Sequence, residues 1–491
     1  MYSPRQKIFW FAFSSRITVL ILQFLANLLI PDHDAGVFIS PEEPGLRRTS
    51  LDVAVDKLFG GLKRWDAQYF LHIAQYGYTY ENCLAFFPAF PITVRCIGFC
   101  LNNFLYSVLN LHSQFLIAAV VLNFVIFLKT ADVFYRLSVR VLRNESRAYK
   151  ATILFCINPA SIFFTAPYSE SMFALMSFLT MLKCTDSESL RFANINIISG
   201  IPAALTLVTR SNGLVNLGFI MYASLKNYKV FLPFLTLPLL ASSVALIMTL
   251  LVALLPFYLV QLYNYFKFCM PHDHKVPEFL LNNDYVIPGS ATSPWCNDTL
   301  PISYGYVQSH YWDVGLFKYY RIKQIPNFIL AAPVLIVILS HCISYIKHNY
   351  KTFFTLEFVY SDRTMFVYVI HALVLTISCI LFVHIQVSTR LLASASPILY
   401  WICSYSINLG TPTIDQNAIN EHFRRLGVGK RIPSHHLLIA NLEGVENMYS
   451  KWRTFIITRK MPDFYSRLVQ YYFLGYFIIG TILFSNFLPW T

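Results

Sequence analysis

Long apolar runs alternate with polar segments along the chain, at spacings typical of a polytopic membrane protein. A transmembrane helix needs about 20 consecutive, mostly apolar residues, and several runs reach that length. Because helices satisfy their own backbone hydrogen bonds in lipid, we expect an all-α bundle of roughly 8 to 11 transmembrane helices. The pattern divides the chain into a cytosolic N-terminus with a first span (residues 1–31), a first lumenal loop (32–84), a membrane bundle (85–265), a second large lumenal loop (266–326), a further part of the bundle (327–409), a cytosolic insert (410–470) and a last span (471–491).

Two of the apolar runs are predicted to fold as pairs of short spans that meet at a lumenal corner. Residues 151–181 have their corner near 167–170, and residues 193–222 have theirs at 209–213. Between residues 129 and 150 the chain is basic, and its apolar residues recur at helical spacing. This stretch is therefore predicted to lie along the cytoplasmic surface.

The composition agrees with this hydrophobic pattern. Of 491 residues, 56% are hydrophobic and only 13% are charged, about half the charged fraction of an average soluble domain. The 43 Phe and 31 Tyr residues need burial, which excludes an intrinsically disordered chain. A cytosolic soluble enzyme is excluded as well.

The chain carries a net charge of +13. In a membrane protein such an excess is typical of cytoplasmic loops, which orient the spans, and no basic run is combined with aromatic residues as in a nucleic-acid-binding segment. We therefore expect no nucleic-acid partner. Arg5, Lys7 and Arg16 are predicted to hold the N-terminus in the cytosol, ahead of an uncleaved first span.

The cysteines and histidines give little sign of a metal site. The ten cysteines form no C-x-x-C pair, and His272-Asp273-His274 lacks the spacing of a metal-binding helix, so no metal is expected. Cys269 and Cys296 fall in one polar loop and can pair if that loop lies in an oxidising lumen. The same loop carries a glycosylation sequon at Asn297.

Candidate catalytic residues gather at the predicted lumenal corners. Asp66 follows Trp65 and precedes a short helical pattern, so it is expected to cap that helix, to serve as a general base, or to do both. Trp65 offers a flat apolar face to a sugar ring. Glu170 is either a hydrated loop acid or a functional carboxylate between two spans.

Two arginines at other corners are candidate phosphate ligands. Arg210 and Arg390 can each neutralise a lipid phosphate, or else extend toward lipid head groups. Trp312-Asp313 repeats the Trp-Asp pair in a tyrosine-rich loop, which is interpreted as a packed lumenal cap over a groove. No P-loop, G-x-S-x-G or G-x-G-x-x-G motif is present, so nucleotide-driven chemistry has no support.

Several motifs in order along the chain resemble the PIG-V family of glycosylphosphatidylinositol (GPI) mannosyltransferases, which belong to the GT-C class. The similarity extends from about residue 60 to residue 400 and returns at the end of the sequence, and it is weak before residue 58 and in the insert 410–470. The motifs are Arg64-Trp65-Asp66, Ala85-Phe86-Phe87-Pro88, Tyr168-Ser169-Glu170, Thr209-Arg210-Ser211-Asn212-Gly213, Pro294-Trp295-Cys296, Tyr311-Trp312, Lys323-Gln324-Ile325-Pro326-Asn327-Phe328, Thr389-Arg390 and Asn486-Phe487-Leu488-Pro489-Trp490-Thr491.

The resemblance implies a GT-C-like bundle in the endoplasmic reticulum membrane whose lumenal loops carry the active site. It implies transfer of the second, α-1,6-linked mannose to the GPI precursor from dolichyl phosphate mannose, with inversion and without a tightly bound cofactor. Asp66 would be the catalytic base, and Glu170 would orient the acceptor or the base. The substrate-binding positions would be Arg64, Trp65, Tyr168, Arg210, Asn212, Trp312 and Arg390.

Other functions stay open at this level. A lipid transporter or flippase would also carry ionisable residues in a membrane bundle, although transporters place them near the midplane and are built from repeated halves. Another dolichyl-phosphate-sugar-dependent GT-C transferase is the nearer alternative. The sequence leaves open whether a small accessory membrane subunit is needed besides the lipid substrates.

Overall fold

A computed structural model describes residues 3–186, 200–231, 237–271, 276–281, 285–351, 365–407 and 464–490. Within these ranges the regular secondary structure is entirely helical. The α-helices are α1 (Pro4–Leu29), α2 (Ser50–Phe59), α3 (Ala67–Tyr76), α4 (Ala89–Leu105), α5 (Leu111–Leu142), α6 (Glu145–Cys156), α7 (Glu170–Asp186), α8 (Gly200–Leu207), α9 (Leu217–Phe231), α10 (Leu237–Cys269), α11 (Ser303–Trp312), α12 (Ile325–His348), α15 (Met365–Leu381), α16 (Ser388–Ala395), α17 (Pro397–Ser406) and α21 (Phe464–Ser485). Short 3₁₀ helices are η1 (Gly60–Leu62), η2 (Glu81–Ala85), η3 (Ser161–Phe164), η6 (Ser211–Asn216), η7 (Glu278–Leu280), η8 (Pro294–Asn297), η9 (Ile322–Gln324) and η10 (Ile385–Val387).

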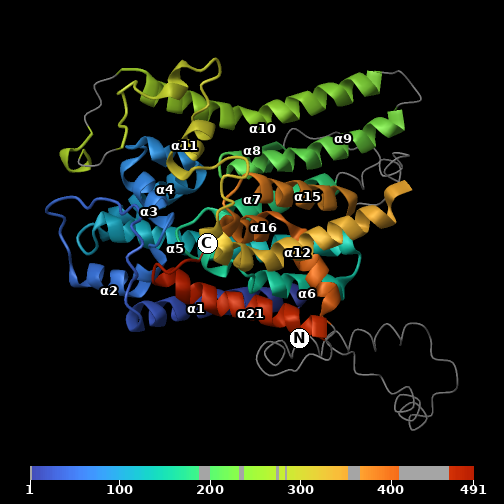
Figure 1. Ribbon diagram of the computed structural model, residues 1–491, viewed down its shortest axis with the longest axis horizontal. Helices are drawn as coiled ribbons and strands as arrows, with labels where there is room; N and C mark the ends of the chain where they lie inside the picture. The colour runs from blue at the N-terminus through green and yellow to red at the C-terminus, as the bar shows by residue number, and fades with distance from the viewer. Residues whose placement is uncertain are drawn as a thin grey trace, which may run out of the picture.

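The all-α, polytopic architecture expected from the sequence is confirmed. Five of the described helices are long and apolar enough to cross a membrane: α1, α5, most of α10, α12 with the preceding turn, and α21. The long helices run side by side along the longest axis of the molecule, while the short helices α2, α3, α4 and α11 gather at its left end (Figure 1). The bundle therefore has one end built from short helices and loops.

The long helices differ in how much of their surface the protein covers. α5 packs against α1, α4, α6 and α7, and half of its most apolar window is buried inside the protein. For α10 that share is only 11%, and Leu251, Leu255 and Leu259 are exposed. Because exposed apolar surface of this extent needs an apolar solvent, α5 forms the centre of the bundle and α10 faces lipid.

The basic stretch 129–150 does not form a separate surface helix, so that prediction is wrong. α5 continues without a break to Leu142, and α6 starts three residues later. Val133 and Leu137, two of the apolar residues that recur at helical spacing in this stretch, are fully buried in the core. The helical spacing was correct, but its apolar face packs against protein.

Arg16 also lies elsewhere than expected. Its side chain is fully buried in the bundle, where Nη1 donates to the Ser161 carbonyl oxygen (2.8 Å) and to Thr165 Oγ1 (2.9 Å), and Nη2 donates to the Cys156 carbonyl oxygen (3.0 Å). The guanidinium also lies over the Phe127 ring. Arg16 therefore joins α1 to the end of α6 and to η3, from a position in the middle of α1.

Helices flank the two predicted corners. α6 with η3 precedes the corner at 167–170 and α7 follows it, while α8 precedes the corner at 209–213 and η6 with α9 follows from it. The region predicted as the first lumenal loop (32–84) contains the helices α2, η1, α3 and most of η2, and α10 is one continuous helix. α21 begins at Phe464, so the last residues of the predicted insert belong to this helix, while residues 408–463 lie outside the described part of the chain.

A second hydrophobic core forms in the large loop after α10 and fixes α11 against η2. Its polar centre is the buried Glu81 carboxylate, which accepts hydrogen bonds from Trp295 Nε1 (2.7 Å) and the Tyr311 hydroxyl (2.8 Å). Cys269 and Cys296 form a disulfide in the same region. These contacts hold the start of the loop and α11 in one unit.

Candidate active site

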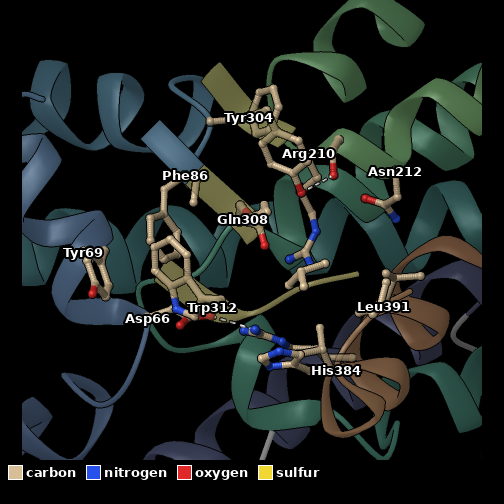
Figure 2. A pocket seen from close by; sticks show the side chains of 18 of the residues that line it. Asp66, Tyr69, Phe86, Arg210, Asn212, Tyr304, Gln308, Trp312, His384 and Leu391 are labelled. Carbon is tan, nitrogen blue, oxygen red and sulfur yellow. Dashed lines mark hydrogen bonds and ion pairs between the residues drawn. The ribbon is translucent and has the colours of Figure 1, made fainter. Parts of the chain in front are cut away.

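A cavity of about 760 Å³ lies where the short helices meet the bundle. Its walls come from the turn before α3, from η2, η6 and α11, and from α15 and α16. Six residues expected to bind substrate or to act in catalysis line it together: Trp65, Asp66, Arg210, Asn212, Trp312 and Arg390. In Figure 2, Asp66, Phe86 and Trp312 lie on one side of the cavity, and Arg210, Asn212 and Leu391 lie on the other.

Tyr168 holds the turn that carries Asp66 through two hydrogen bonds. The Asp66 backbone N–H donates to the Tyr168 hydroxyl (3.0 Å), and this hydroxyl donates to the Arg64 carbonyl oxygen (3.2 Å). Burial, with Asp66 and Glu170 nearby, raises the pKa of Tyr168 well above its ordinary value, so it remains a neutral hydroxyl. Tyr168 thus fixes the turn and does not itself line the cavity.

Asp66 stands immediately before α3, but its side chain makes no capping hydrogen bond to that helix. Its Oδ2 atom instead forms an ion pair with Arg390 Nη2 at 2.7 Å. The carboxylate remains 27% exposed and lines the cavity. The expected helix cap is therefore not formed, and the carboxylate is open to the cavity.

Glu170 has a different environment, although it is also paired with arginine. Its side chain is fully buried at the first residue of α7, where the helix dipole favours a negative charge. It forms an ion pair with Arg210, and Arg390 Nη1 lies 3.8 Å from its Oε1 atom. Because Glu170 does not line the cavity, the geometry favours a role in holding the two arginines over direct contact with the acceptor.

Arg210 is presented by a tight turn between α8 and η6. The Gly213 N–H donates to the Arg210 carbonyl oxygen (3.0 Å), and a Cβ atom on Gly213 would lie only 2.6 Å from the Thr206 carbonyl carbon. Only glycine permits this close approach of η6 to the end of α8. The turn thereby holds Arg210 between Glu170 and the cavity.

Arg390 lies on the short buried helix α16 and links the two carboxylates. Burial alone would lower its pKa, but the charges of Asp66 and Glu170 outweigh that effect and raise the pKa above its ordinary value. Arg390 is therefore a permanent positive charge in the cavity wall.

The wall beside Asp66 is aromatic. Tyr69 stacks on Phe86 with ring centroids 4.5 Å apart, and the Trp312 ring meets both edge-on at 6.0 and 5.9 Å. All three residues line the cavity. Flat rings beside a carboxylate are a typical surface for a sugar.

The wall beside the arginines is aliphatic. It is formed by η6, by α15 with the residues that follow it, and by α16, through Leu214, Val215, Leu375, Val383 and Leu391. Leu214 lines the cavity and is also 57% exposed, so the cavity reaches the surface of the bundle at this point. This wall is suited to an apolar chain attached to an anionic group.

Three enclosed N–H groups on cavity-lining residues have no hydrogen-bond partner within the described residues: Trp65 Nε1, Asn212 Nδ2 and Arg390 Nε. An enclosed donor without an acceptor costs about 1–3 kcal/mol. A ligand rich in oxygen atoms, such as a sugar or a phosphate, has the acceptors that these groups lack.

Arg64 was predicted to bind substrate, but its side chain contacts other parts of the protein. Its Nη2 atom pairs with Asp32 (2.8 Å) and donates to Asn27 Oδ1 (2.7 Å), and Arg64 does not line the cavity. Trp312, in contrast, lines the cavity as part of its aromatic wall. Asn297 is exposed, as a glycosylation acceptor must be.

Sequence reasoning missed several residues of the cavity. Tyr69 follows Asp66 by three residues, and helical spacing could have placed it beside the carboxylate. Tyr304 was noted only as part of a tyrosine-rich loop, and Gln308 follows it by one helical turn of α11. His384 also lines the cavity, although no local sequence feature indicates this position. Burial lowers the pKa of its imidazole.

No group of three or more His, Cys, Asp or Glu side chains that could hold a metal ion is found among the described residues. His272, Asp273 and His274 lie outside them. Asp66 supplies the one carboxylate among the described residues that line the cavity, and it is paired with Arg390, which is unlike a metal-binding set of several carboxylates.

The chain resembles known proteins in sequence over most of its length. The model of the family described as "Mannosyltransferase (PIG-V)" matches residues 5–491. The chain is 40% identical over 418 residues to "GPI mannosyltransferase 2" of Drosophila pseudoobscura pseudoobscura, covering 81% of this chain and 91% of that protein. It is 34% identical over 515 residues to "GPI alpha-1,6-mannosyltransferase 2" of Homo sapiens, covering 99% of both. Among solved structures, an oligosaccharyltransferase of Archaeoglobus fulgidus aligns with a TM-score of 0.41 and 11% identity over 94% of this chain, which spans 55% of that protein's length.

Proposed function

The chain belongs to the PIG-V mannosyltransferase family, and we propose that its cavity is the site where a mannosyl group passes from a lipid phosphate to a GPI precursor. The chain is a GPI-anchor mannosyltransferase. We assign dolichyl phosphate mannose as the donor and a mannosylated GPI precursor as the acceptor, with an α-1,6 bond as the product. The observation that carries this assignment is the meeting of Asp66, Arg210 and Arg390 in one cavity.

Asp66 is the general base in this proposal. A β-linked mannosyl phosphate that gives an α-mannoside reacts by one in-line displacement. The 6-hydroxyl oxygen of the acceptor attacks C1 of the donor mannose and forms the new C1–O bond, its proton passes to Asp66, and the bond from C1 to the phosphate oxygen breaks. The partial exposure of the carboxylate and its place on the cavity wall support this role.

The leaving group is dolichyl phosphate, whose charge must be stabilised as the bond breaks. Arg210 and Arg390 present guanidinium groups to the cavity, and each can form a bidentate contact with a phosphate. Glu170 keeps them in place from behind, because it pairs with Arg210 and lies 3.8 Å from Arg390. In this arrangement Glu170 is a positioning residue and does not touch the reacting atoms.

The two remaining walls suit the rest of each substrate. The aliphatic wall at Leu214, Leu375 and Leu391 lies next to the arginines and can receive the first isoprene units of the donor lipid. On the side of Asp66, the aromatic wall of Tyr69, Phe86 and Trp312 can receive the acceptor sugars. Donor and acceptor would then approach Asp66 from opposite walls.

We place the cavity on the lumenal side of the endoplasmic reticulum membrane, with the N-terminus in the cytosol. The disulfide between Cys269 and Cys296 supports this orientation, because disulfides persist in oxidising compartments. It lies in the loop that also carries α11 and the cap residue Trp312.

Complementation in cells that lack the second GPI mannosyltransferase tests the function. Wild-type chain and Asp66→Ala are expressed at equal levels, and GPI-anchored surface proteins and lipid intermediates are measured. We expect wild type to restore surface display and to clear a one-mannose intermediate, and we expect Asp66→Ala to leave it in place.

Two outcomes would contradict the proposal. Accumulation of a different mannosylated precursor in cells that express the wild-type chain would show that the acceptor is wrong. Full activity of a correctly localised Asp66→Ala chain would exclude the base.

A further inference from the structure

The turn that carries Asp66 touches a segment more than 400 positions away in the sequence. Residues 486–490 follow α21, and Phe487 among them contacts Arg64 and Trp65 in the turn formed by residues 63–66. In the sequence this segment stands out only as part of the family motif Asn486-Phe487-Leu488-Pro489-Trp490-Thr491. The assigned chemistry does not use it.

Arg64 connects the two segments directly. Its Nε atom donates to the Ser485 carbonyl oxygen (3.1 Å), and its guanidinium lies over the Phe487 ring with the central carbon 4.5 Å from the ring centroid. The same side chain pairs with Asp32 just after α1. Arg64 thus joins the ends of two membrane helices to the turn that carries Asp66.

Phe487 also contacts Trp65, the residue before Asp66. Their rings meet edge to face with centroids 6.0 Å apart, and Phe487 is 9% exposed. Trp65 at the same time lines the cavity. A displacement of Phe487 would therefore move the cavity wall through its contact with Trp65.

Both aromatic residues have an unusual backbone conformation. Trp65 has φ = +54° and Phe487 has φ = +56°. Bulky side chains disfavour this left-handed region, and such residues persist only where the surrounding contacts hold them. Here each of the two strained residues is part of what holds the other.

The segment is itself anchored at several points. The Asn486 carbonyl oxygen accepts a hydrogen bond from the His33 N–H (3.0 Å), and the buried Trp490 ring lies 5.0 Å from the Tyr476 ring on α21. Phe487 is therefore supported on both sides and presents a fixed surface to Trp65.

We propose that Phe487, with Arg64, is a positioning residue that fixes the Trp65–Asp66 turn for catalysis. This inference rests on the proposed role of Asp66 as the base. It reassigns Arg64 from substrate binding to positioning. Because a general base must lie within hydrogen-bond reach of the acceptor hydroxyl, a small displacement of the turn lowers the rate more than it weakens the binding of either substrate.

The test compares three substitutions at one position in the full-length chain. Microsomes supply the enzyme, and kcat and KM are measured with dolichyl phosphate mannose and a one-mannose GPI acceptor. Phe487→Ala removes the ring but keeps the strained backbone, Phe487→Gly removes both the ring and the strain, and Phe487→Tyr keeps the ring. Leu488→Ala, one residue along, is the control that leaves Arg64, Trp65 and Phe487 in place, and Asp66→Asn is measured in parallel.

We expect Phe487→Ala and Phe487→Gly both to lower kcat by about 10- to 100-fold, while both KM values change less than about twofold. Phe487→Tyr and Leu488→Ala should retain activity within about threefold of wild type. The melting temperature of Phe487→Gly should be no lower than that of Phe487→Ala, because glycine accepts a positive φ. Loss of activity in the more stable variant separates positioning from general destabilisation.

The proposal is overturned if kcat follows melting temperature across the variants, if KM rises while kcat is kept, or if Leu488→Ala loses as much activity. Unchanged kcat in Phe487→Gly beside an inactive Asp66→Asn would exclude the positioning role alone. Full activity of Asp66→Asn would instead contradict the proposed base, whatever the Phe487 variants do.

Discussion

The two sides of the cavity place negative charge differently. Near the aromatic wall, Asp66 is 27% exposed and lines the cavity, whereas near the aliphatic wall Glu170 is fully buried behind Arg210 and Arg390. Both carboxylates contact arginine, but only Asp66 can reach a ligand. The difference shows how one cluster of ion pairs can leave one carboxylate open to the cavity and bury the other behind two arginines.

Removing the exposed carboxylate should have the largest effect. We expect Asp66→Asn to lower kcat by about 10²- to 10⁴-fold, because the amide cannot accept the acceptor proton. The measurement is a microsomal assay with both substrates varied. Glu42→Gln, at an exposed acid that pairs with Arg48, is the matched control and should keep wild-type rates. Equal activity of Asp66→Asn and wild type would remove the distinction between the two carboxylates.

Neutralising the buried carboxylate should act through the arginines. Glu170→Gln leaves Arg210 and Arg390 without a shared counterion, so we expect the KM for the donor to rise about tenfold and the chain to lose stability. Removing one partner of a buried ion pair typically costs about 3–5 kcal/mol. Donor titration and thermal melting of the detergent-solubilised chain check these effects. A rise in the KM for the acceptor alone would mean that Glu170 orients the acceptor.

Replacing each arginine by lysine should distinguish the role of Arg210 from that of Arg390. Arg210→Lys and Arg390→Lys each keep the charge but lose the bidentate phosphate contact, so the KM for the donor should rise about five- to tenfold. Arg390→Lys should lower kcat as well, because Arg390 also holds Asp66. Kinetic constants for both substrates decide the point. Equal effects on donor and acceptor would argue against phosphate binding.

The aromatic wall should show the smallest effect. Trp312→Ala removes one ring from the face that we assign to the acceptor, and such ring contacts contribute about 0.5–1.5 kcal/mol. We therefore expect the KM for the acceptor to rise about threefold to tenfold while the KM for the donor stays constant. Trp312→Phe should recover most of the loss. A selective change in donor use would reverse our assignment of the two walls.

The membrane class and several cavity residues could be predicted from the sequence because their signals are local. Apolar runs of spanning length predicted an all-helical bundle, and Asp66 and Arg210 stand out because charged residues beside apolar spans are costly to bury. Trp312 was among the predicted substrate-binding residues, and it lines the cavity. The burial of Glu170 behind two arginines was not predicted.

The rest depended on contacts between distant parts of the chain. The pairing of Asp66 with Arg390 joins residues 324 positions apart, and nothing in either local pattern specifies the partner. The basic stretch after residue 129 was misassigned because an apolar helical face looks the same whether it packs on lipid or on α6 and α7. His384 has no local signal at all.

The buried Arg16 bears on how the chain enters the membrane. Inserting an arginine at the centre of an isolated helix costs about 2.5–3.5 kcal/mol on translocon scales. Its hydrogen-bond acceptors at Cys156, Ser161 and Thr165 lie 140 to 149 residues further along the chain. The ribosome therefore synthesises these acceptors long after α1 has emerged. During synthesis the Arg16 guanidinium must therefore stay hydrated, at the lipid surface or in the insertion channel, until α6 and η3 have been made and can accept its hydrogen bonds.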